Sequence, residues 1–460
     1  MSVLSVLLLL QGALLLDHHQ AFGQDGSDEP ATIQVGQATL SSGDSVVFLG
    51  DSITHQRLYT QYIENFFITR FPDVRLQFHN AGISGDLAWD ALQRLDRDVL
   101  SKDPRLVTIL LGMNDGRYKP FDQEIFDTYR KDMTTLVDRL SESGAVVAPI
   151  TPTMFDAVAA KAFSKHRARD PSTIEEYNAL LAYFGTWLRD DADRRGLQSI
   201  DMFGPLNQLT REARQARPDN PEFTYITDAV HPGSNGQLIM AFSWLQDLGM
   251  KGPVSNITLV PTKKGYRARV AGGEVSDLVA DEDEISFNFM ADSLPWVTPD
   301  ATIAANQLRL GHRYSREGFQ VHGLEPGKYE LLIDNISIGQ FSQTQLAAHI
   351  ELQKFPSTPQ SVQANRVVAM NQARNQGVVR QLRDHWFIFR NLQRNERQLA
   401  SVTDEKAKSQ LEAKIAKGKE AMKTFESKLA AIEQKADEEL AAVYDAAQPT
   451  PHRYVLKRVE

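Results

Sequence analysis

Residues 46–52 read VVFLGDS, so a serine follows closely after a short apolar run. A short run that is rich in β-branched residues is typical of a strand buried within a sheet. Residues 74–78 alternate between apolar and polar residues like a second strand, comparable apolar runs occur at about 106–111 and 145–150, and a weaker one lies at 199–202. We predict strands at the first four of these positions and keep 199–202 as a candidate fifth strand.

Stretches with helical spacing separate these runs. Apolar residues recur every three or four positions at roughly 56–70, 87–100, 122–142 and 174–195. A regular alternation of strand and helix builds a parallel sheet with helices on both faces. The predicted fold class is therefore α/β, and ligands are expected beyond the carboxyl ends of the strands.

Polar or small residues follow three of the predicted strands. Ser52 stands at a strand-to-helix turn, where its hydroxyl would reach the sheet edge and its N–H would favour an anion. The alternative is an ordinary N-cap serine. Residues 80–86, NAGISGD, follow the second strand, and Gly85 could offer its backbone N–H to the same point. The alternative there is a flexible loop.

The third predicted strand is followed by residues 112–116, GMNDG. The side-chain amide of Asn114 can donate a hydrogen bond to a developing oxyanion. The alternative is a turn in which Asn114 makes only local hydrogen bonds.

Residues 228–232, DAVHP, precede a predicted helix from about 233 to 248. The carboxylate of Asp228 is close enough in sequence to accept a hydrogen bond from Nδ1 of His231. That bond would leave Nε2 free to act as a general base. The alternative is a histidine on the surface without a catalytic role.

Taken together, the four motifs resemble the SGNH (GDSL-type) hydrolase family over roughly residues 44–248. The family's marker residues correspond to Ser52, Gly85, Asn114 and His231, with Asp228 as the third member of a catalytic triad. The resemblance implies a flavodoxin-like α/β/α three-layer sandwich with a parallel sheet.

The resemblance also implies a reaction, the hydrolysis of an ester through an acyl-enzyme. Ser52 would be the nucleophile, His231 the general base and acid, and Asp228 the residue that orients His231. The oxyanion hole would consist of the N–H groups of Ser52 and Gly85 and the amide of Asn114. No cofactor or metal is required.

The expected substrate is an O-acyl ester, with acetyl preferred, on an extracellular carbohydrate. Two alternatives remain, a lipolytic hydrolase of the lysophospholipase or arylesterase type and a non-catalytic carbohydrate-binding envelope protein. Five side chains near the motifs are candidate substrate contacts: Trp89, Arg117, Tyr118, His55 and Phe155. For Trp89, the alternative is a place in the protein core on the apolar stripe of its helix, and this alternative is at least as well supported.

The rest of the chain has a different character. Residues 253–345 combine alternating apolar residues with turn signals, which predicts a small antiparallel β region after the hydrolase domain at 40–250. Residues 360–448 lack proline and carry one apolar stripe from Leu411 to Val443. A helical hairpin is predicted, with an intermolecular coiled coil as the alternative.

The N-terminal residues 1–23 contain a short apolar run and then small residues, which predicts a secretory signal peptide cleaved near Gly23. The protein is then expected to be exported, either to the periplasm or to the medium. An uncleaved anchor is the alternative. No later segment is apolar enough to span a membrane.

Composition excludes several other classes. The chain has 460 residues, with 50 Lys and Arg against 59 Asp and Glu, a net charge of -9. This balance argues against nucleic acid as a partner. There is no cysteine, which excludes disulfides, thiolate zinc sites and a cysteine nucleophile. The expected partner is a small ester or an acylated polysaccharide, and the oligomeric state is left open.

Overall fold

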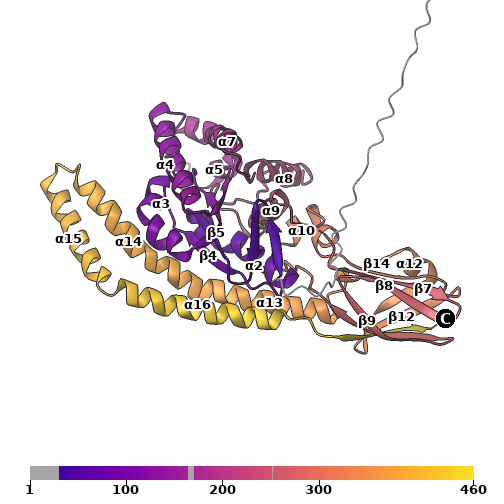
Figure 1. The fold of residues 1–460 in the computed structure, drawn as a ribbon. Coiled ribbons are helices and arrows are strands. Elements are labelled where there is room, and N and C mark those ends of the chain that lie inside the picture. Colours follow the sequence, from indigo (N-terminus) through magenta and orange to yellow (C-terminus); the bar gives the residue numbers. More distant parts are fainter. Residues whose placement is uncertain (1–30, 164–169, 251, 460) are drawn as a thin grey trace, which may run out of the picture. The chain divides into compact units, whose positions relative to one another are not determined.

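The computed structural model describes residues 31–163, 170–250 and 252–459 (Figure 1). The predicted signal peptide at residues 1–23 lies outside the described residues. Within the described ranges, no helix combines the length and the apolar character needed to cross a membrane.

A four-stranded parallel sheet forms the centre of the first part of the chain. Its order is β4-β3-β5-β6, and Ile200 adds one parallel bridge to Ile150 beside β6. The strands are β3 (Ser45–Gly50), β4 (Gln77–Gly82), β5 (Pro104–Leu110) and β6 (Val146–Ile150). The strand order reverses between β3 and β5, and this topological switch point is where doubly wound folds bind ligands.

The predicted strands differ from the observed ones in two places. The second strand begins at Gln77, where pairing with Ser45 starts, and not at Val74. The candidate at 199–202 is reduced to the single bridge of Ile200.

Helices flank this sheet, as the predicted α/β/α three-layer class requires (Figure 1). Phe48 on β3 contacts both Tyr59 of α2 and Trp244 of α9, so this helix pair packs on the apolar centre of the sheet. The helices are α1 (Ser52–His55), α2 (Leu58–Arg70), α3 (Ala88–Arg94), α4 (Gln123–Glu142), α5 (Ala157–Ala162), α7 (Pro171–Arg194), α8 (Phe203–Gln215) and α9 (Ser234–Asp247). The helix α8 and an N-terminal strand pair, β1 (Thr32–Val35) and β2 (Ala38–Ser41), were not predicted.

The β region consists of two sheets around a separate apolar cluster. Their orders are β14-β11-β7-β8 and β13-β12-β15-β10-β9. All pairs are antiparallel except β11 with β7, which is parallel. The strands are β7 (Ser255–Thr262), β8 (Gly265–Ala271), β9 (Gly273–Ala280), β10 (Glu284–Ala291), β11 (Glu317–Val321), β12 (Lys328–Ile333), β13 (Ile336–Ser342), β14 (Ile350–Glu351) and β15 (His452–Arg458).

Two segments depart from the predicted division of the chain. The strand β15 follows the helices, yet it lies between β12 and β10, and Tyr454 stacks on Phe287 in the β core. Between β10 and β11, α10 (Thr302–Gln307) and α11 (Leu310–Tyr314) contribute apolar side chains to the α/β core instead. We keep the predicted domain limits as a proposal, with β15 added to the β region.

The helical hairpin comprises residues 359–447. Its first arm is α13 (Pro359–Arg374), a π-helical turn at Asn375–Val379 and α14 (Arg380–Leu399); its second arm is α15 (Glu405–Met422) and α16 (Phe425–Ala447). Most of the predicted stripe is buried, including Leu411, Phe425 and Leu440. The stripe packs within the chain itself: Phe425 contacts Trp386 on α14, and Leu440 and Val443 join the α/β core.

Candidate active site

The structure brings Ser52, His231 and Asp228 into one hydrogen-bonded row. Ser52 begins α1 directly after β3, and its Oγ lies 2.8 Å from Nε2 of His231. Nδ1 of the same histidine lies 2.7 Å from Oδ2 of Asp228. This is the geometry in which an imidazole can take a proton from a serine hydroxyl while a carboxylate fixes its orientation.

A constrained turn holds Asp228 against His231. Ala229 between them has a φ of 71°, a left-handed value that is uncommon for residues other than glycine. Its side chain is fully buried, and its carbonyl accepts a hydrogen bond from the N–H of Asp156 at 3.0 Å. The surrounding contacts therefore hold this backbone conformation in place.

The carboxylate of Asp228 is strongly biased toward its charged form. Partial burial opposes ionisation, but hydrogen bonds from the ring and backbone of His231 and from the N–H of Val230 outweigh it. The net effect lowers the pKa of Asp228 to about 2. A carboxylate that stays ionised can stabilise an imidazolium beside it.

Two further predicted residues follow the strands on either side of β3. Gly85 lies in the loop between β4 and α3 with a φ of 79°, which glycine adopts without strain. Asn114 follows β5, and its Nδ2 donates to the carbonyl of Asp86 at 3.1 Å and to Oδ2 of Asp51 at 3.3 Å. The motifs after β3, β4 and β5 therefore meet at one edge of the sheet.

Beneath this edge lies a layer of buried carboxyl groups that the sequence analysis did not identify. We call Asp51, Asp86 and Asp115 the carboxylate layer. Burial raises the pKa of Asp51 to about 7, of Asp86 to about 6 and of Asp115 to about 7. A signal was present in the sequence, because each aspartate is adjacent to a motif residue: Ser52, Gly85 or Asn114.

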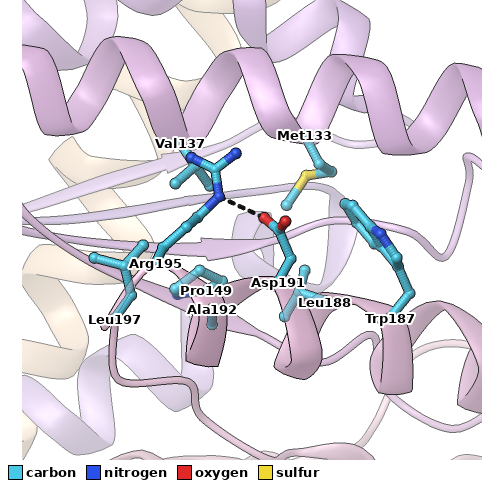
Figure 2. Close-up of a pocket in the computed structure, with 9 residues that line it drawn as sticks. All are labelled: Met133, Val137, Pro149, Trp187, Leu188, Asp191, Ala192, Arg195 and Leu197. Atoms are coloured by element: carbon cyan, nitrogen blue, oxygen red, sulfur yellow. Dashed lines mark hydrogen bonds and ion pairs between the residues drawn. The ribbon is translucent and has the colours of Figure 1, made fainter.

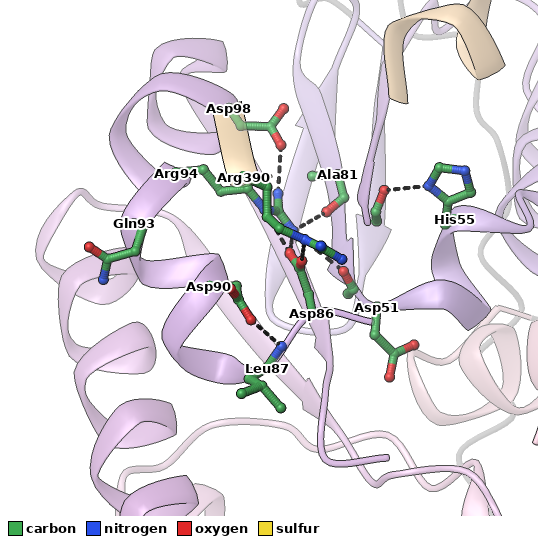
Figure 3. A network of polar contacts seen from close by, with 12 residues as sticks. Asp51, His55, Ala81, Asp86, Leu87, Asp90, Gln93, Arg94, Asp98 and Arg390 are labelled. Carbon is green, nitrogen blue, oxygen red and sulfur yellow. Dashed lines mark hydrogen bonds and ion pairs between the residues drawn. The ribbon is translucent and has the colours of Figure 1, made fainter. Parts of the chain in front are cut away.

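One arginine neutralises part of this layer from inside the α/β core. Arg94 of α3 is fully buried and donates to Asp86 at 3.0 Å and to Asp98 at 2.5 Å (Figure 3). It also donates to the carbonyl of Ala81 at 2.8 Å, which fixes the end of β4. Fully buried charges occur in proteins almost only when they are paired in this way.

A second set of arginines reaches the site from α14 of the hairpin. Arg390 donates to the carboxylate of Asp86 at 3.0 Å and also to the carbonyl of Ser84. Arg394 donates to Asp90 at 2.6 Å and to the carbonyl of Gly85 at 2.6 Å. Residues about 300 positions away in sequence thus contact the Gly85 loop, defined here as residues 83–86.

The candidate substrate contacts lie in different surroundings. Trp89 is half-buried under the guanidinium of Arg397, 3.9 Å from the ring centre. Arg117 is exposed, while Tyr118 is half-buried and stacks on Tyr177 at 4.9 Å. Phe155 is buried in the core, so the ring has no face open to a ligand.

His55 is held in its neutral form beside the hairpin. Burial, and then the charges of Arg57 and Arg383, lower the pKa of His55 to about 4. Its Nδ1 lies 3.3 Å from the carbonyl of Gly82, and its ring packs against Phe387 at 5.4 Å. It lines an open hollow of about 370 Å³ between the start of α2 and the hairpin.

A second cavity is too small to hold a substrate. It lies between α4, α7 and the end of β6, where Met133, Pro149 and Trp187 line it, and its volume is about 10 Å³ (Figure 2). That is room for about one water molecule. Among the residues described, no group of three or more His, Asp or Glu side chains is placed to hold a metal ion.

Known proteins match either the α/β part or most of the chain. Residues 48–239 match the model of the GDSL-like lipase/acylhydrolase family. The α/β part of the chain belongs to this family. The resemblance to SGNH (GDSL-type) hydrolases is therefore confirmed, and the protein is a serine hydrolase of carboxylic esters.

Two similar proteins differ in how much of this chain they cover. An acetylxylan esterase of Geobacillus stearothermophilus is 24% identical over 235 residues, which are 46% of this chain and 97% of the relative. The solved structure of a gut microbial diltiazem-metabolizing enzyme covers 93% of this chain and 99% of its own, with 25% identity and a TM-score of 0.75. The second match extends into the β region and the hairpin. A solved structure of the acetylxylan esterase covers 47% of this chain and 97% of its own, at 21% identity and a TM-score of 0.37.

Proposed function

We propose that this protein removes O-acyl groups, with acetyl preferred, from a carbohydrate ester through an acyl-enzyme on Ser52. The observation that carries the proposal is the row from Ser52 Oγ through His231 to Asp228, with gaps of 2.8 and 2.7 Å. His231 Nε2 takes the hydroxyl proton as Oγ attacks the ester carbonyl. The same nitrogen then returns the proton to the departing alkoxide.

Water completes the cycle by the same route. His231 removes a proton from water, the resulting hydroxide equivalent attacks the acyl carbonyl, and the free acid leaves while Oγ regains its proton. Asp228 stays ionised throughout and stabilises the imidazolium. The products are one carboxylic acid and one alcohol, so the balance requires no further reactant.

Three donors are proposed to bind the oxyanion: the N–H groups of Ser52 and Gly85 and the amide of Asn114. The Asn114 amide keeps one hydrogen on the carbonyl of Asp86. Its longer bond, 3.3 Å to Asp51, is the one that a ligand oxygen would replace. Each such donor contributes about 3–4 kcal/mol of transition-state stabilisation.

Different observations support the two parts of the proposed substrate, the acetyl group and the carbohydrate. The acetylxylan esterase of G. stearothermophilus aligns over nearly its full length. Half-buried Trp89 and Tyr118 are the proposed contacts for sugar rings, with Arg117 and His55 at the border of the site. Export is proposed from the sequence of residues 1–23 alone, and the N-terminal sequence of protein recovered from the periplasm or medium tests it.

The decisive experiment compares Ser52→Ala with the wild type. Turnover of p-nitrophenyl acetate by Ser52→Ala should fall roughly 10⁴- to 10⁶-fold with no change in melting temperature. Ser101→Ala is the matched control, because its exposed hydroxyl bonds only to the carbonyl of Arg97 nearby. Substantial esterase activity in Ser52→Ala would contradict the assignment of the nucleophile.

A second candidate is an ester on a small, non-carbohydrate molecule. The match that spans 93% of the chain supports it, since that protein is described as metabolizing diltiazem. A panel of acetylated xylo-oligosaccharides, diltiazem and octanoyl esters separates the candidates by kcat/KM. Preference for the oligosaccharides favours the first proposal, preference for diltiazem the second, and preference for octanoyl esters a lipolytic enzyme.

A further inference from the structure

The hairpin contacts the Gly85 loop at its main chain as well as at its side chains. Arg390 donates to the carbonyl of Ser84, and Arg394 to the carbonyl of Gly85 at 2.6 Å. Arg390 also lies directly against Gly85, because a Cβ built on this glycine would stand 3.3 Å from its Nη2. A side chain at position 85 would therefore press on the guanidinium.

The contact with Ser84 determines how the N–H of Gly85 is directed. The carbonyl of Ser84 and the N–H of Gly85 belong to the same peptide unit, which is planar and trans. The oxygen and the hydrogen lie in this plane and point in opposite directions across the C–N bond, so fixing the direction of the oxygen also fixes the direction of the hydrogen. A cation on the carbonyl also polarises the unit, which makes its N–H a stronger donor.

The second oxyanion donor is linked to the same arginine. Arg390 donates to the carboxylate of Asp86 at 3.0 Å, and Arg94 holds the other oxygen of this carboxylate. The backbone carbonyl of Asp86 accepts the 3.1 Å bond from Asn114 Nδ2. Arg390 thus contacts both the peptide that carries the Gly85 N–H and the residue that holds Asn114.

The carboxylates that receive these arginines are shielded from water. The side chain of Asp86 is fully buried, and that of Asp90 is 1% exposed. Charge pairs in such surroundings are screened little by solvent and leave an uncompensated charge when one partner is removed. The link between α14 and the Gly85 loop is therefore specific and costly to break.

We propose that Arg390 and Arg394 of the hairpin are positioning residues that hold the oxyanion donors Gly85 and Asn114 in place for ester hydrolysis. This inference rests on the proposed function, because it needs an oxyanion at that point. It assigns a catalytic contribution to a part of the chain that lies outside the residues matched by the family model.

The test is steady-state hydrolysis of p-nitrophenyl acetate by full-length Arg390→Ala, Arg390→Lys and Arg394→Ala. Both alanine variants should lose roughly 10- to 100-fold in kcat, because donors displaced by a fraction of an ångström bind the oxyanion less well. KM should change little, since the oxyanion forms only in the transition state. Arg390→Lys should retain more of kcat than Arg390→Ala, because lysine keeps the positive charge but lacks the planar guanidinium that donates to two acceptors at once.

A matched control separates positioning from stability. Arg374→Met also breaks a buried ion pair between hairpin and α/β core, here with Glu64 at 3.2 Å, but it does not contact the Gly85 loop. It should lower the melting temperature while its kcat stays at the wild-type value. Arg75→Ala, which removes an exposed pair with Asp445, is the milder control.

A transition-state analogue provides the second readout. The dissociation constant of a boronic acid that forms a tetrahedral adduct with Ser52 should rise in proportion to the loss of kcat/KM in each variant. Arg394→Ala keeps the test open if Arg390→Ala does not fold, because the Arg394 side chain is 35% exposed.

The outcomes distinguish the two proposals. Wild-type kcat in Arg394→Ala and in every folded Arg390 variant would overturn the positioning role and leave the proposed function intact. The same holds if kcat falls only as far as in Arg374→Met. If the wild type shows no hydrolysis that depends on Ser52, the proposed function fails first, and the positioning role fails with it.

Discussion

Asp228 and Asp115 are the same kind of side chain near one active site, yet their environments shift the pKa in opposite directions. Asp228 has a side chain 32% exposed and several N–H donors around it, and its pKa is lowered to about 2. Asp115 is 7% exposed and accepts one bond, from the N–H of Ala88, while Oδ2 has no partner; burial raises its pKa to about 7. The number of hydrogen-bond donors and the access of solvent, not the residue type, therefore decide which of the two carboxylates is ionised at neutral pH.

The largest expected effect is the loss of turnover when the ionised carboxylate of Asp228 is replaced by an uncharged amide. Asp228→Asn should lower kcat by about 10⁴-fold, because an amide favours the wrong tautomer of His231 and cannot stabilise its charged form. Stability at neutral pH should change far less, since the group is partly in water. Kinetics with p-nitrophenyl acetate beside a urea unfolding curve measures both. Wild-type kcat in Asp228→Asn would show that the ionised carboxylate of Asp228 does not contribute to catalysis.

The next effect is on stability, when the buried layer loses its central cation. Arg94→Met should lower the free energy of unfolding by about 3–5 kcal/mol, because it leaves Asp86 and Asp98 each with one arginine fewer in a dry site. Urea denaturation gives the value. The control is Arg139→Met, whose partner Asp96 is exposed, and it should cost less than about 1 kcal/mol. Equal losses in both variants would mean that burial adds nothing to the Arg94 pairs.

The last effect concerns the pH dependence of stability and is confined to the range above pH 4. The folded state keeps the Asp115 proton up to about pH 7, whereas the unfolded chain loses it near 3.8, so ionisation lowers stability as the pH rises through this window. Asp115→Asn should therefore be more stable than the wild type above pH 7, by up to about 4 kcal/mol for a pKa that rises from 3.8 to about 7, with the difference vanishing below pH 4. Thermal unfolding from pH 4 to 8 measures it. A constant difference across that range would show that Asp115 does not titrate there.

Local sequence patterns were enough to predict the row of Ser52, His231 and Asp228. They were not enough to predict which side chains surround it. Ser52 and its neighbours form a strand end and a helix start that the pattern alone indicates, and Asp228 and His231 are close enough in sequence to pair within one turn. Phe155 shows the limit of this reasoning, since proximity to a strand end suggested a ligand contact and the ring is buried in the core.

Strands and helices that depend on distant partners escaped the sequence analysis for the same reason. Residues 452–458 form the strand β15 because they pair with β10 on one side and with β12 on the other. Val74 has an alternating neighbourhood, but pairing with β3 begins at Gln77 and decides where the strand starts.

Periodicity and short motifs predict the α/β order of elements, the four motif segments and the apolar stripe of the hairpin, because these features depend on residues near one another in the chain. The folded arrangement was needed to show that Arg390 and Arg394 contact the Gly85 loop and that Asp51, Asp86 and Asp115 share one buried layer. Burial and charge pairing depend on distances in space, and partners separated by about 300 residues leave no periodic trace in the chain.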